Sequence, residues 1–258
     1  MDFTERYGPW AVVTGAAMGV GLAFVEELHQ RGLGVVMVDR DPVVRAVAAR
    51  RAEPTVAVVV DVRDPGWTEV LEEAVGDREI GLAVANAGVS YVGRFLDMEP
   101  AQRATLLDVN CRATVDLAAW AIPAMVARDR GGFVTTSSGS ALAGTAGVAL
   151  YSATKAFSVN LVEAIGWELK DTGVHSLAIL APSMDTPAFR AGRADESKMM
   201  APPVDPRTVV SAALDDLPRG GRWLADEGLE FAAAVERAER VDMISAATTA
   251  MYPHIFDR

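Results

Sequence analysis

The feature of this sequence that most constrains its fold is a regular alternation of short β-branched runs with longer stretches of helical periodicity. The apolar runs are continuous, which is typical of strands that are covered on both faces. The predicted strands are Trp10–Thr14, Gly34–Asp39, Val56–Asp61, Ile80–Asn86, Phe133–Ser138 and Val174–Leu180. The predicted helices between them are Gly19–Arg31, Pro42–Arg51, Pro65–Val75, Pro100–Arg128 and Ala149–Thr172. This order predicts an α/β fold with a doubly wound parallel sheet of about seven strands and helices on both faces.

The sequence after the sixth predicted strand differs from the rest of the chain in its proline content and apolar pattern. Residues 183–205 carry closely spaced prolines without clean periodicity, which predicts a lid over a substrate; the alternatives are a binding loop and a disordered segment. A helix at Pro206–Leu217, a short strand at Arg222–Ala225 and a C-terminal helical extension at about 227–258 are expected to follow. The extension has three open interpretations: it packs on its own domain, forms a subunit contact or covers the substrate. No linker composition interrupts the chain, so we expect residues 1–258 to form a single domain.

The net charge and composition of the chain exclude some classes of binding partner. The net charge of −11 makes nucleic acid a poor partner, because phosphate backbones attract cationic proteins. The single cysteine, Cys111, cannot form an internal disulfide, and the amino terminus lacks the order of a signal peptide. No apolar run of about 18 residues predicts a membrane span. We therefore expect a cytoplasmic protein that binds neither nucleic acid nor membranes. The scattered histidines His29, His175 and His254 have no metal-ligand spacing and predict no metal site.

A glycine-rich turn between the first predicted strand and helix indicates a dinucleotide site. The segment reads Thr-Gly-Ala-Ala-Met-Gly-Val-Gly, and its candidate ligand-binding residues are Thr14, Gly15, Met18, Gly19 and Gly21. Glycines let the backbone approach a pyrophosphate closely, and the amino terminus of the following helix favours an anion. The spacing differs from the common Gly-x-Gly-x-x-Gly fingerprint. The alternative is a glycine-rich turn that holds no ligand.

The end of the second predicted strand bears on the choice of cofactor. Asp39 can accept hydrogen bonds from the hydroxyls of an adenosine ribose and would repel a 2′-phosphate, which favours NAD. Arg40 follows directly and could pair with that phosphate, so NADP stays possible. The alternative for Asp39 is a solvated acid at a strand end.

Tyr151 and Lys155 are the candidate reacting pair. They lie four residues apart in a predicted helix, so both side chains can point at one site. An ammonium near a phenol lowers its pKa, and the phenol can then give or take a proton at working pH. Ser138, at the end of the fifth predicted strand, could donate a hydrogen bond to a carbonyl oxygen. The alternatives are a core tyrosine, a surface lysine and a turn serine.

These motifs together resemble the short-chain dehydrogenase/reductase family over nearly the whole chain, with a Rossmann-type fold. The glycine turn resembles the family's nucleotide motif, and the segment from Asn86 to Gly88 resembles its strand-four motif. By this resemblance Tyr151 is the acid/base, Ser138 steadies the carbonyl oxygen and Lys155 holds the nicotinamide ribose. Asn110 is the fourth member of the catalytic set and supports a proton relay through water. The resemblance also implies cofactor contacts from Tyr151 and Lys155, and from Asp61, Val62, Asn86, Ala87, Gly88, Pro182 and Thr186.

The chain departs from the family pattern after the sixth predicted strand. The family usually has Pro-Gly there, whereas this chain has Pro182 followed by Ser183. The Ser183 side chain is expected to tighten the space near the nicotinamide, and its backbone adopts positive φ less freely than glycine. The segments around Tyr7 and Tyr151 resemble the branch that contains 3-ketoacyl and 17-ketosteroid reductases.

The resemblance implies an oxidoreductase that transfers hydride between a nicotinamide cofactor and a secondary alcohol or ketone. A small-molecule substrate of medium size and largely apolar character is expected, because the lid and the extension are apolar. The family mostly assembles through the two long predicted helices, so a homodimer or homotetramer is expected. Two other functions on the same fold stay open: a catalytically silent nucleotide sensor or scaffold, and a dehydratase or epimerase that uses transient oxidation.

Overall fold

The computed structural model describes residues 2–192, 194–199 and 201–255, and it centres on a seven-stranded parallel sheet. The sheet order is β3-β2-β1-β4-β5-β6-β7, so the chain reverses its direction of growth between β1 and β4. This doubly wound arrangement confirms the predicted fold class. The strands are β1 (Trp10–Thr14), β2 (Gly34–Asp39), β3 (Thr55–Val59), β4 (Ile80–Ala85), β5 (Gly131–Thr136), β6 (Val174–Leu180) and β7 (Gly221–Leu224).

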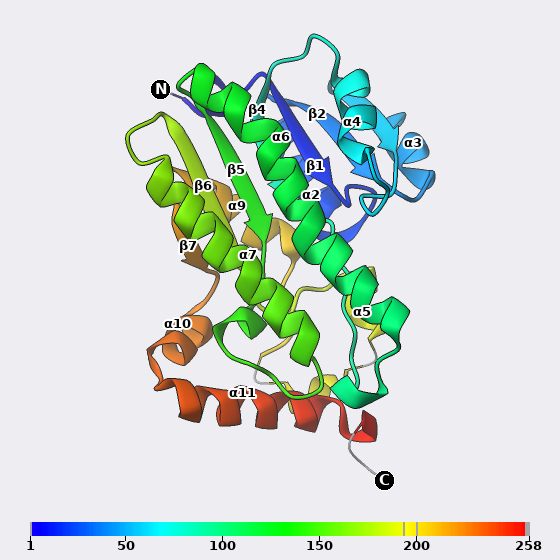
Figure 1. Ribbon diagram of the computed structural model, residues 1–258, viewed down its shortest axis with the longest axis vertical. Helices are drawn as coiled ribbons and strands as arrows, with labels where there is room; N and C mark the ends of the chain where they lie inside the picture. The colour runs from blue at the N-terminus through cyan, green and yellow to red at the C-terminus, as the bar shows by residue number, and fades with distance from the viewer. Residues whose placement is uncertain (1, 193, 200, 256–258) are drawn as a thin grey trace.

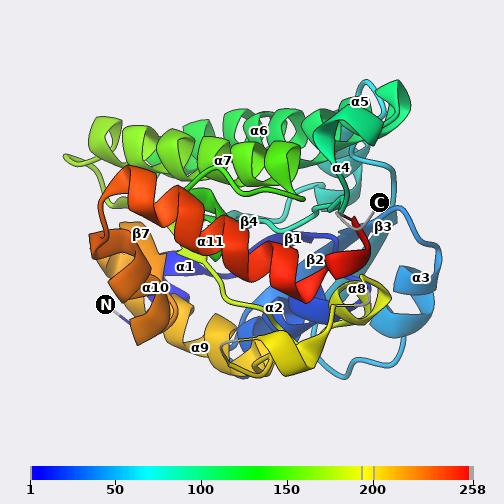
Figure 2. The ribbon, with the colours of Figure 1, turned by 90° about the horizontal axis from the view of Figure 1, so that it is seen from below.

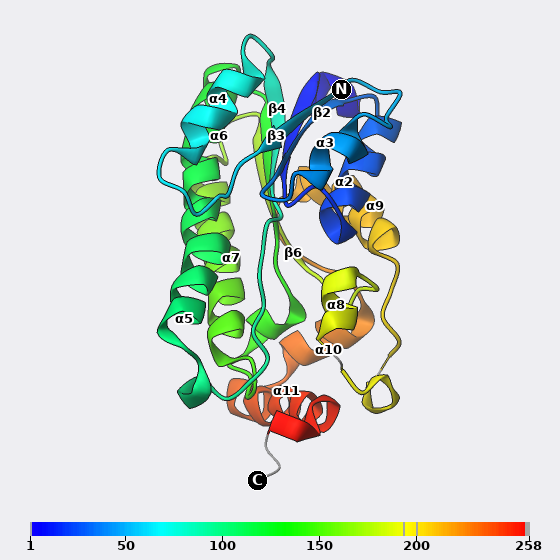
Figure 3. The ribbon, with the colours of Figure 1, turned by 90° about the vertical axis from the view of Figure 1, so that its right-hand side faces the viewer.

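Two layers of helices cover the sheet, as Figure 3 shows edge-on. One face carries α4 (Trp67–Val75), α6 (Ala113–Ala127) and α7 (Ala149–Glu168). The other face carries α2 (Gly19–Gln30), α3 (Val43–Ala48) and α9 (Pro206–Asp216). Both faces of the central strands are buried, which explains why their sequences read as continuous apolar runs.

The carboxyl ends of the strands lie toward α8 (Pro187–Ala191), α10 (Glu227–Ala234) and α11 (Arg237–Met251), in the lower half of Figure 3; α10 and α11 are also labelled at the bottom of Figure 1. In open parallel sheets, ligands bind outside this edge where the strand order reverses. The reversal between β1 and β4 therefore marks the place where a site is expected.

The predicted helix Pro100–Arg128 is divided in the structure. It forms α5 (Pro100–Leu107) and α6, with a π-helical turn at Asp108–Arg112 between them. Apolar periodicity continues through such a turn, so it did not reveal the break. The turn contains Asn110, and π turns in helices often occur at functional sites.

The predicted C-terminal helical extension at about 227–258 is also divided, into α10 and α11. Val235 is extended, and the side chain of Glu236 accepts hydrogen bonds from the backbone N–H groups of Ala238 and Glu239. This cap starts a new helix instead of continuing the first. Residues 256–258 of the predicted extension lie outside the described residues.

Two smaller differences concern element ends. A short helix α1 (Phe3–Tyr7) precedes β1, stabilised by a capping box between Asp2 and Glu5. Strands β5 and β3 end earlier than predicted, so Ser138 and Asp61 lie in the loops that follow them.

The predicted lid at 183–205 has local structure. A parallel bridge joins Met184 to Val204 at its base, and α8 and a 3-10 turn at Glu196–Lys198 lie between them. The backbone N–H of Asp185 donates to Val204 O at 2.9 Å, and Val204 N–H donates to Ser183 O at 3.0 Å. Arg193 and Met200, which fall within the predicted lid, lie outside the described residues. In the parts of the chain that the structure describes, no helix is long and apolar enough to cross a membrane.

Candidate active site

The glycine turn forms a cradle between β1 and α2. Gly15 and Gly19 have positive φ values of 66° and 56°, which disfavour residues with a Cβ. A Cβ on Gly21 would overlap the carbonyl oxygen of Gly15, so a glycine at this position lets the helix close against the turn. The three glycines therefore bring backbone, rather than side chains, to the floor of the cradle.

The amino terminus of α2 points into this cradle with its first N–H groups uncapped. Met18 is the N-cap residue, is 48% exposed and makes no side-chain capping hydrogen bond. The first N–H groups of a helix have no partner inside the helix, and together with the positive end of the dipole they suit an anion. The cradle therefore fits the pyrophosphate of a dinucleotide.

Thr14 and Asn86 brace the cradle from beneath. The Thr14 hydroxyl accepts hydrogen bonds from the N–H groups of Asn86 and Ala87 at 3.1 and 3.0 Å. The Asn86 carboxamide donates to the carbonyl oxygens of Thr14 and Gly15 at 3.0 and 3.3 Å. These side chains join β1 to the turn after β4, so their main contribution is to the shape of the site.

Asp39 lies at the end of β2 and is held by backbone N–H groups on both carboxylate oxygens. Ala17 N–H donates to one oxygen and Asp41 N–H to the other, each at 2.9 Å. The carboxylate is thereby fixed beside the glycine turn, where an adenosine ribose would lie. Arg40, the other residue predicted to bear on cofactor choice, is exposed.

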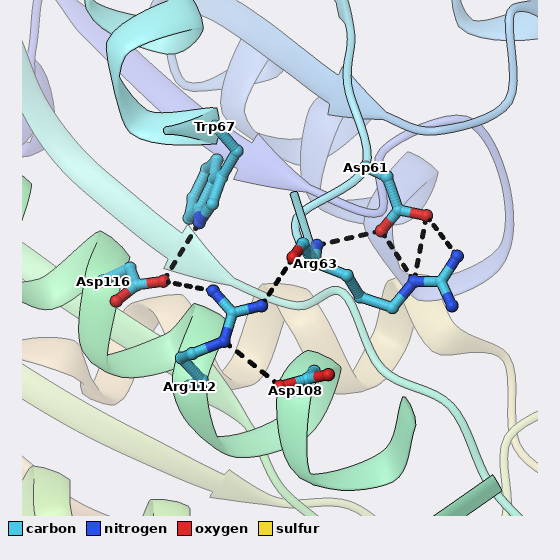
Figure 4. Close-up of polar contacts among 6 residues, drawn as sticks. All are labelled: Asp61, Arg63, Trp67, Asp108, Arg112 and Asp116. Carbon is cyan, nitrogen blue, oxygen red and sulfur yellow. Dashed lines mark hydrogen bonds and ion pairs between the residues drawn. The ribbon is translucent and has the colours of Figure 1, made fainter. Parts of the chain in front are cut away.

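Asp61 forms an ion pair that the sequence did not reveal, shown in Figure 4. Arg63 Nε lies 3.0 Å from both Asp61 oxygens, and Arg63 Nη2 lies 2.7 Å from one of them. The hydrogen bonds from Arg63 hold the pKa of the Asp61 carboxyl below its ordinary value. The carbonyl of Arg63 in turn accepts a 2.7 Å hydrogen bond from Arg112. The side chain of Val62, also predicted to contact cofactor, is buried in the core, which leaves its backbone for any ligand.

Tyr151, Ser138 and Lys155 come together at the carboxyl edge. Tyr151 and Lys155 lie one turn apart in α7, with Lys155 Nζ 5.6 Å from the centre of the Tyr151 ring. The Ser138 side chain lies near the Tyr151 phenol and lowers the pKa of that phenol. Lys155 is 8% exposed, and its ammonium donates a 2.8 Å hydrogen bond to the carbonyl oxygen of Thr136.

Burial dominates the protonation of both groups. It raises the pKa of the Tyr151 phenol, against the hydrogen bond from Ser138, which lowers that pKa. It lowers the pKa of the Lys155 ammonium to about 8. The sequence predicts instead that Lys155 lowers the pKa of Tyr151. In the structure, the ammonium is directed at the Thr136 carbonyl oxygen, and burial is the largest influence on the Tyr151 pKa.

Asn110 sits in the π-helical turn and is 4% exposed. Its carboxamide accepts a hydrogen bond from Val89 N–H and donates to Val89 O, both at 2.9 Å, and donates to the Thr154 hydroxyl at 3.0 Å. Asn110 therefore ties the loop after β4 to α7. A Cβ on Gly88 would lie 3.4 Å from Lys155 Nζ and 3.6 Å from Asn110 Oδ1, so these groups surround one point.

Thr186 faces the glycine turn from the lid. A Cβ on Gly19 would lie 3.5 Å from Thr186 Cβ, and the Thr186 hydroxyl caps α8 by accepting from Phe189 N–H at 3.1 Å. Pro182 is partly buried at the start of this segment. Ser183 replaces the family's glycine without strain, because Asp129 is the one non-glycine residue with positive φ in the described ranges.

Three features of the site are absent from the predictions made from the sequence. The carbonyl oxygen of Thr136 receives the Lys155 ammonium, and Arg63 occupies the Asp61 carboxylate. Tyr252, which follows α11, contributes to raising the pKa of Tyr151. Backbone acceptors and contacts between distant segments leave no local pattern. The Asp-x-Arg spacing of Asp61 and Arg63 was visible and could have suggested the ion pair.

Comparison with known proteins places this geometry in a family. The family model described as short chain dehydrogenase matches residues 9–197. The chain is 28% identical over 232 residues to 7beta-hydroxysteroid dehydrogenase of Clostridium sardiniense, covering 88% of this chain and 89% of that protein. It is 31% identical over 199 residues to the human protein named inactive hydroxysteroid dehydrogenase-like protein 1, covering 72% of this chain. The chain spans 60% of the length of that human relative.

Solved structures support the same assignment. A structure described in work on 7beta-hydroxysteroid dehydrogenase stereoselectivity superimposes on this chain with a TM-score of 0.82, covering 95% of this chain and 99% of the other. The two sequences are 22% identical, so this match is evidence for the fold alone. A protein of Beutenbergia cavernae, described as a putative NAD(P) dependent gluconate 5-dehydrogenase with bound NADP, superimposes with a TM-score of 0.80 at 28% identity. That match covers 87% of this chain and 98% of the other. Because the family model covers most of its length, this chain belongs to the short-chain dehydrogenase family.

Proposed function

We propose that this chain is an oxidoreductase that moves hydride between a nicotinamide cofactor and a secondary alcohol or ketone. The observation that carries the proposal is the convergence of Tyr151 and Ser138 beside the buried Lys155 ammonium, which lies 5.6 Å from the centre of the Tyr151 ring. This pair lies at the same sheet edge as the uncapped glycine cradle. A proton donor, an oxygen-binding hydroxyl and a dinucleotide cradle are the parts that carbonyl reduction requires.

The residues present fit a nicotinamide dinucleotide. The cradle at Gly15, Gly19 and Gly21 would hold the pyrophosphate, and Asp39 would hold the adenosine ribose. Thr186 and Lys155 would contact the nicotinamide half. When bound, the cofactor would accept or donate the hydride, which no protein side chain can do.

The protein groups then handle the substrate oxygen and its proton. Ser138 donates a hydrogen bond to the oxygen and holds it next to the phenol. In reduction, Tyr151 Oη gives its proton to the oxygen as the carbonyl becomes an alcohol, and in oxidation it takes that proton back. Because burial raises the pKa of Tyr151, the phenol stays protonated at neutral pH and can donate its proton in reduction, whereas alkaline pH favours oxidation. Asn110 and Lys155 would return protons to Tyr151 through water.

We further propose that NAD is preferred and NADP is possible. The fixed Asp39 carboxylate supports NAD, because it would repel a 2′-phosphate. Arg40 is exposed nearby and supports some use of NADP. Among solved structures with similar folds, one 3-ketoacyl-(acyl-carrier-protein) reductase is complexed with NADH and the Beutenbergia protein has bound NADP.

A medium-sized, largely apolar alcohol or ketone is the proposed substrate. The activity for which the Clostridium relative is named, that of a 7beta-hydroxysteroid dehydrogenase, supports this class. The competing function is a catalytically silent nucleotide-binding protein, and it is favoured by the name of the human relative, which is described as inactive. The intact set of Ser138, Tyr151 and Lys155 favours catalysis in this chain.

A cofactor screen separates these functions. NAD and NADP would each be titrated with the protein, then incubated with secondary alcohols and ketones from cyclohexanol to hydroxysteroids. The proposal predicts formation or consumption of reduced cofactor at 340 nm with at least one substrate. Tight cofactor binding without hydride exchange would instead support the silent function. Product change without net redox change would indicate a dehydratase or epimerase.

A further inference from the structure

The Ser138 hydroxyl is fixed to the turn that follows it. The 3-10 turn Gly139–Leu142, the serine turn, begins directly after Ser138. Ser140 N–H donates a 3.2 Å hydrogen bond to the Ser138 hydroxyl, and Gly139 N–H donates one of 2.9 Å to Ala181 O, next to β6. The position of the hydroxyl therefore depends on the position of the serine turn.

The far end of the serine turn is held by Arg240, a residue of α11. Arg240 Nη1 donates a 3.0 Å hydrogen bond to Leu142 O, and Leu142 is the last residue of the turn. Arg240 Nη2 donates to the carbonyl oxygens of Ala233 and Val235 at 2.9 and 2.6 Å. One guanidinium group thus joins the serine turn to the end of α10.

The chemistry of these contacts suits an arginine. The last carbonyl groups of a helix have no partner inside it and lie at the negative end of its dipole, so a cation stabilises the end of α10. The guanidinium presents its N–H donors in fixed directions, whereas an ammonium is a compact charge on a flexible stem. Arg240 is therefore suited to hold two segments of the chain at a fixed separation.

Two further contacts attach the C-terminal extension to the same region. A Cβ on Gly139 would clash with Leu229 Cδ2, so Leu229 of α10 fills the space beside the serine turn. The Ser245 hydroxyl of α11 accepts a 3.1 Å hydrogen bond from Ala146 N–H, in the loop that leads to Tyr151. Figures 1 and 2 show α11 lying across this edge of the molecule. The extension is therefore attached along the segment between the two reacting side chains.

We propose that Arg240 is a positioning residue, which holds the serine turn so that the Ser138 hydroxyl stays where the substrate oxygen binds. The inference rests on the proposed function, because it concerns the step in which Ser138 holds that oxygen. A displacement of about 1 Å at a reacting group can lower a rate by about 10²-fold, even when the altered residue is remote. Arg240 should therefore affect turnover, whereas the glycine cradle between β1 and α2 should keep its affinity for the cofactor.

The test compares Arg240→Ala and Arg240→Lys with Arg237→Ala. Arg237 is the matched control, because it is an exposed arginine of the same helix. For each protein, kcat and KM would be measured with the best substrate from the cofactor screen, and the dissociation constant of NADH from nicotinamide fluorescence. Hydrogen exchange of peptides over residues 138–148 would report the mobility of this segment without any turnover.

Loss of the guanidinium in Arg240→Ala should lower kcat by about tenfold or more, while the dissociation constant of NADH stays within about twofold of wild type. Exchange over residues 138–148 should become about tenfold faster, since hydrogen bonds from a charged donor contribute on that scale. Arg240→Lys keeps the charge without the fork, so its kcat should lie between those of Arg240→Ala and wild type. This variant carries the test if Arg240→Ala does not fold. Arg237→Ala should match wild type throughout.

A double-mutant cycle with Ser138→Ala tests whether Arg240 acts through this hydroxyl. In the Ser138→Ala background no hydroxyl is left to position, so Arg240→Ala should lower kcat further by less than about twofold. An equal loss in both backgrounds would show that Arg240 supports the site in general, and would overturn the proposed role.

The outcomes also separate this inference from the proposed function. If wild type turns over a substrate and both Arg240 variants keep its kcat, the positioning role is wrong and the oxidoreductase function stands. If wild type turns over no substrate, the proposed reaction is wrong, and faster exchange over residues 138–148 in Arg240→Ala would still support its hold on the serine turn. Unchanged exchange in that case would contradict both.

Discussion

Lys155 is an ammonium that the fold buries beside a carbonyl oxygen, and this costs stability at neutral pH. Its pKa of about 8 lies below the ordinary value of 10.5, so the folded protein loses this proton before the unfolded chain does. The burial of this charge therefore lowers the free energy of unfolding by its full amount below pH 8, and this loss of stability disappears as the pH rises toward 10.5. A position that destabilises the fold in this way is typical of a functional group.

We expect the replacement Lys155→Met to remove this pH dependence. Between pH 8 and pH 10 the free energy of unfolding of wild type should rise by about 2 kcal/mol relative to the variant. Urea unfolding of both proteins at half-unit pH intervals measures the difference, and the shared titration of other groups cancels. Parallel pH profiles for the two proteins would show that the ammonium is not desolvated as the structure indicates.

Asp39 carries the proposed preference for NAD. In Asp39→Ala the carboxylate that repels a 2′-phosphate is gone and Arg40 remains. The ratio of kcat/KM for NADP over NAD should therefore rise by about tenfold or more, the factor that corresponds to roughly 1.4 kcal/mol. Asp171→Ala serves as the control, because that carboxylate is 85% exposed and follows α7 at the opposite sheet edge. An unchanged ratio would assign cofactor choice to other residues.

At the scale of elements, the sequence was informative wherever one local pattern governs the structure. The first six strands and the helices α2, α7 and α9 are predicted by the apolar pattern of the sequence. The cradle is predicted by its glycines, because the backbone conformation or the close packing at these positions excludes a side chain. The division of Pro100–Arg128 by a π turn was missed, because Asn110 joins it to Val89 and Thr154 through long-range contacts. The start of α11 was also missed, although Glu236 is a capping residue.

The site residues divide in the same way, into features that a local pattern predicts and features that depend on long-range contacts. Tyr151, Ser138 and Lys155 were identified by spacing and the structure brings them together, whereas the pKa of Tyr151 depends on burial, which spacing does not encode. Asp61 was identified as a cofactor contact without its partner Arg63.

For the whole molecule, the outer surface of α5, α6 and α7 indicates self-association. Helices α6 and α7 lie side by side on one face in Figures 1 and 2. Exposed apolar side chains on these helices are Leu107, Val115, Val126, Phe157 and Trp167, with Trp167 73% exposed. Large exposed apolar groups gathered on one layer are typical of protein interfaces.

We expect a homodimer or homotetramer of the 27.3 kDa chain in solution. Light scattering after size exclusion should give a mass of two or four chains, and Trp167→Glu should shift it toward one chain because a charge is costly at an apolar contact. Phe231→Glu, on α10, is the control and should leave the mass unchanged. A wild-type mass of one chain at every concentration would contradict self-association.

The central claim is that the Tyr151 hydroxyl moves the proton during hydride transfer, and Tyr151→Phe tests it most directly. The substitution keeps the ring and removes the hydroxyl, so binding and chemistry can be measured separately. With the best substrate from the cofactor screen, kcat should fall by about 10²–10⁴-fold, while the dissociation constant of NADH changes by less than about twofold. Near-normal turnover by Tyr151→Phe would contradict the account.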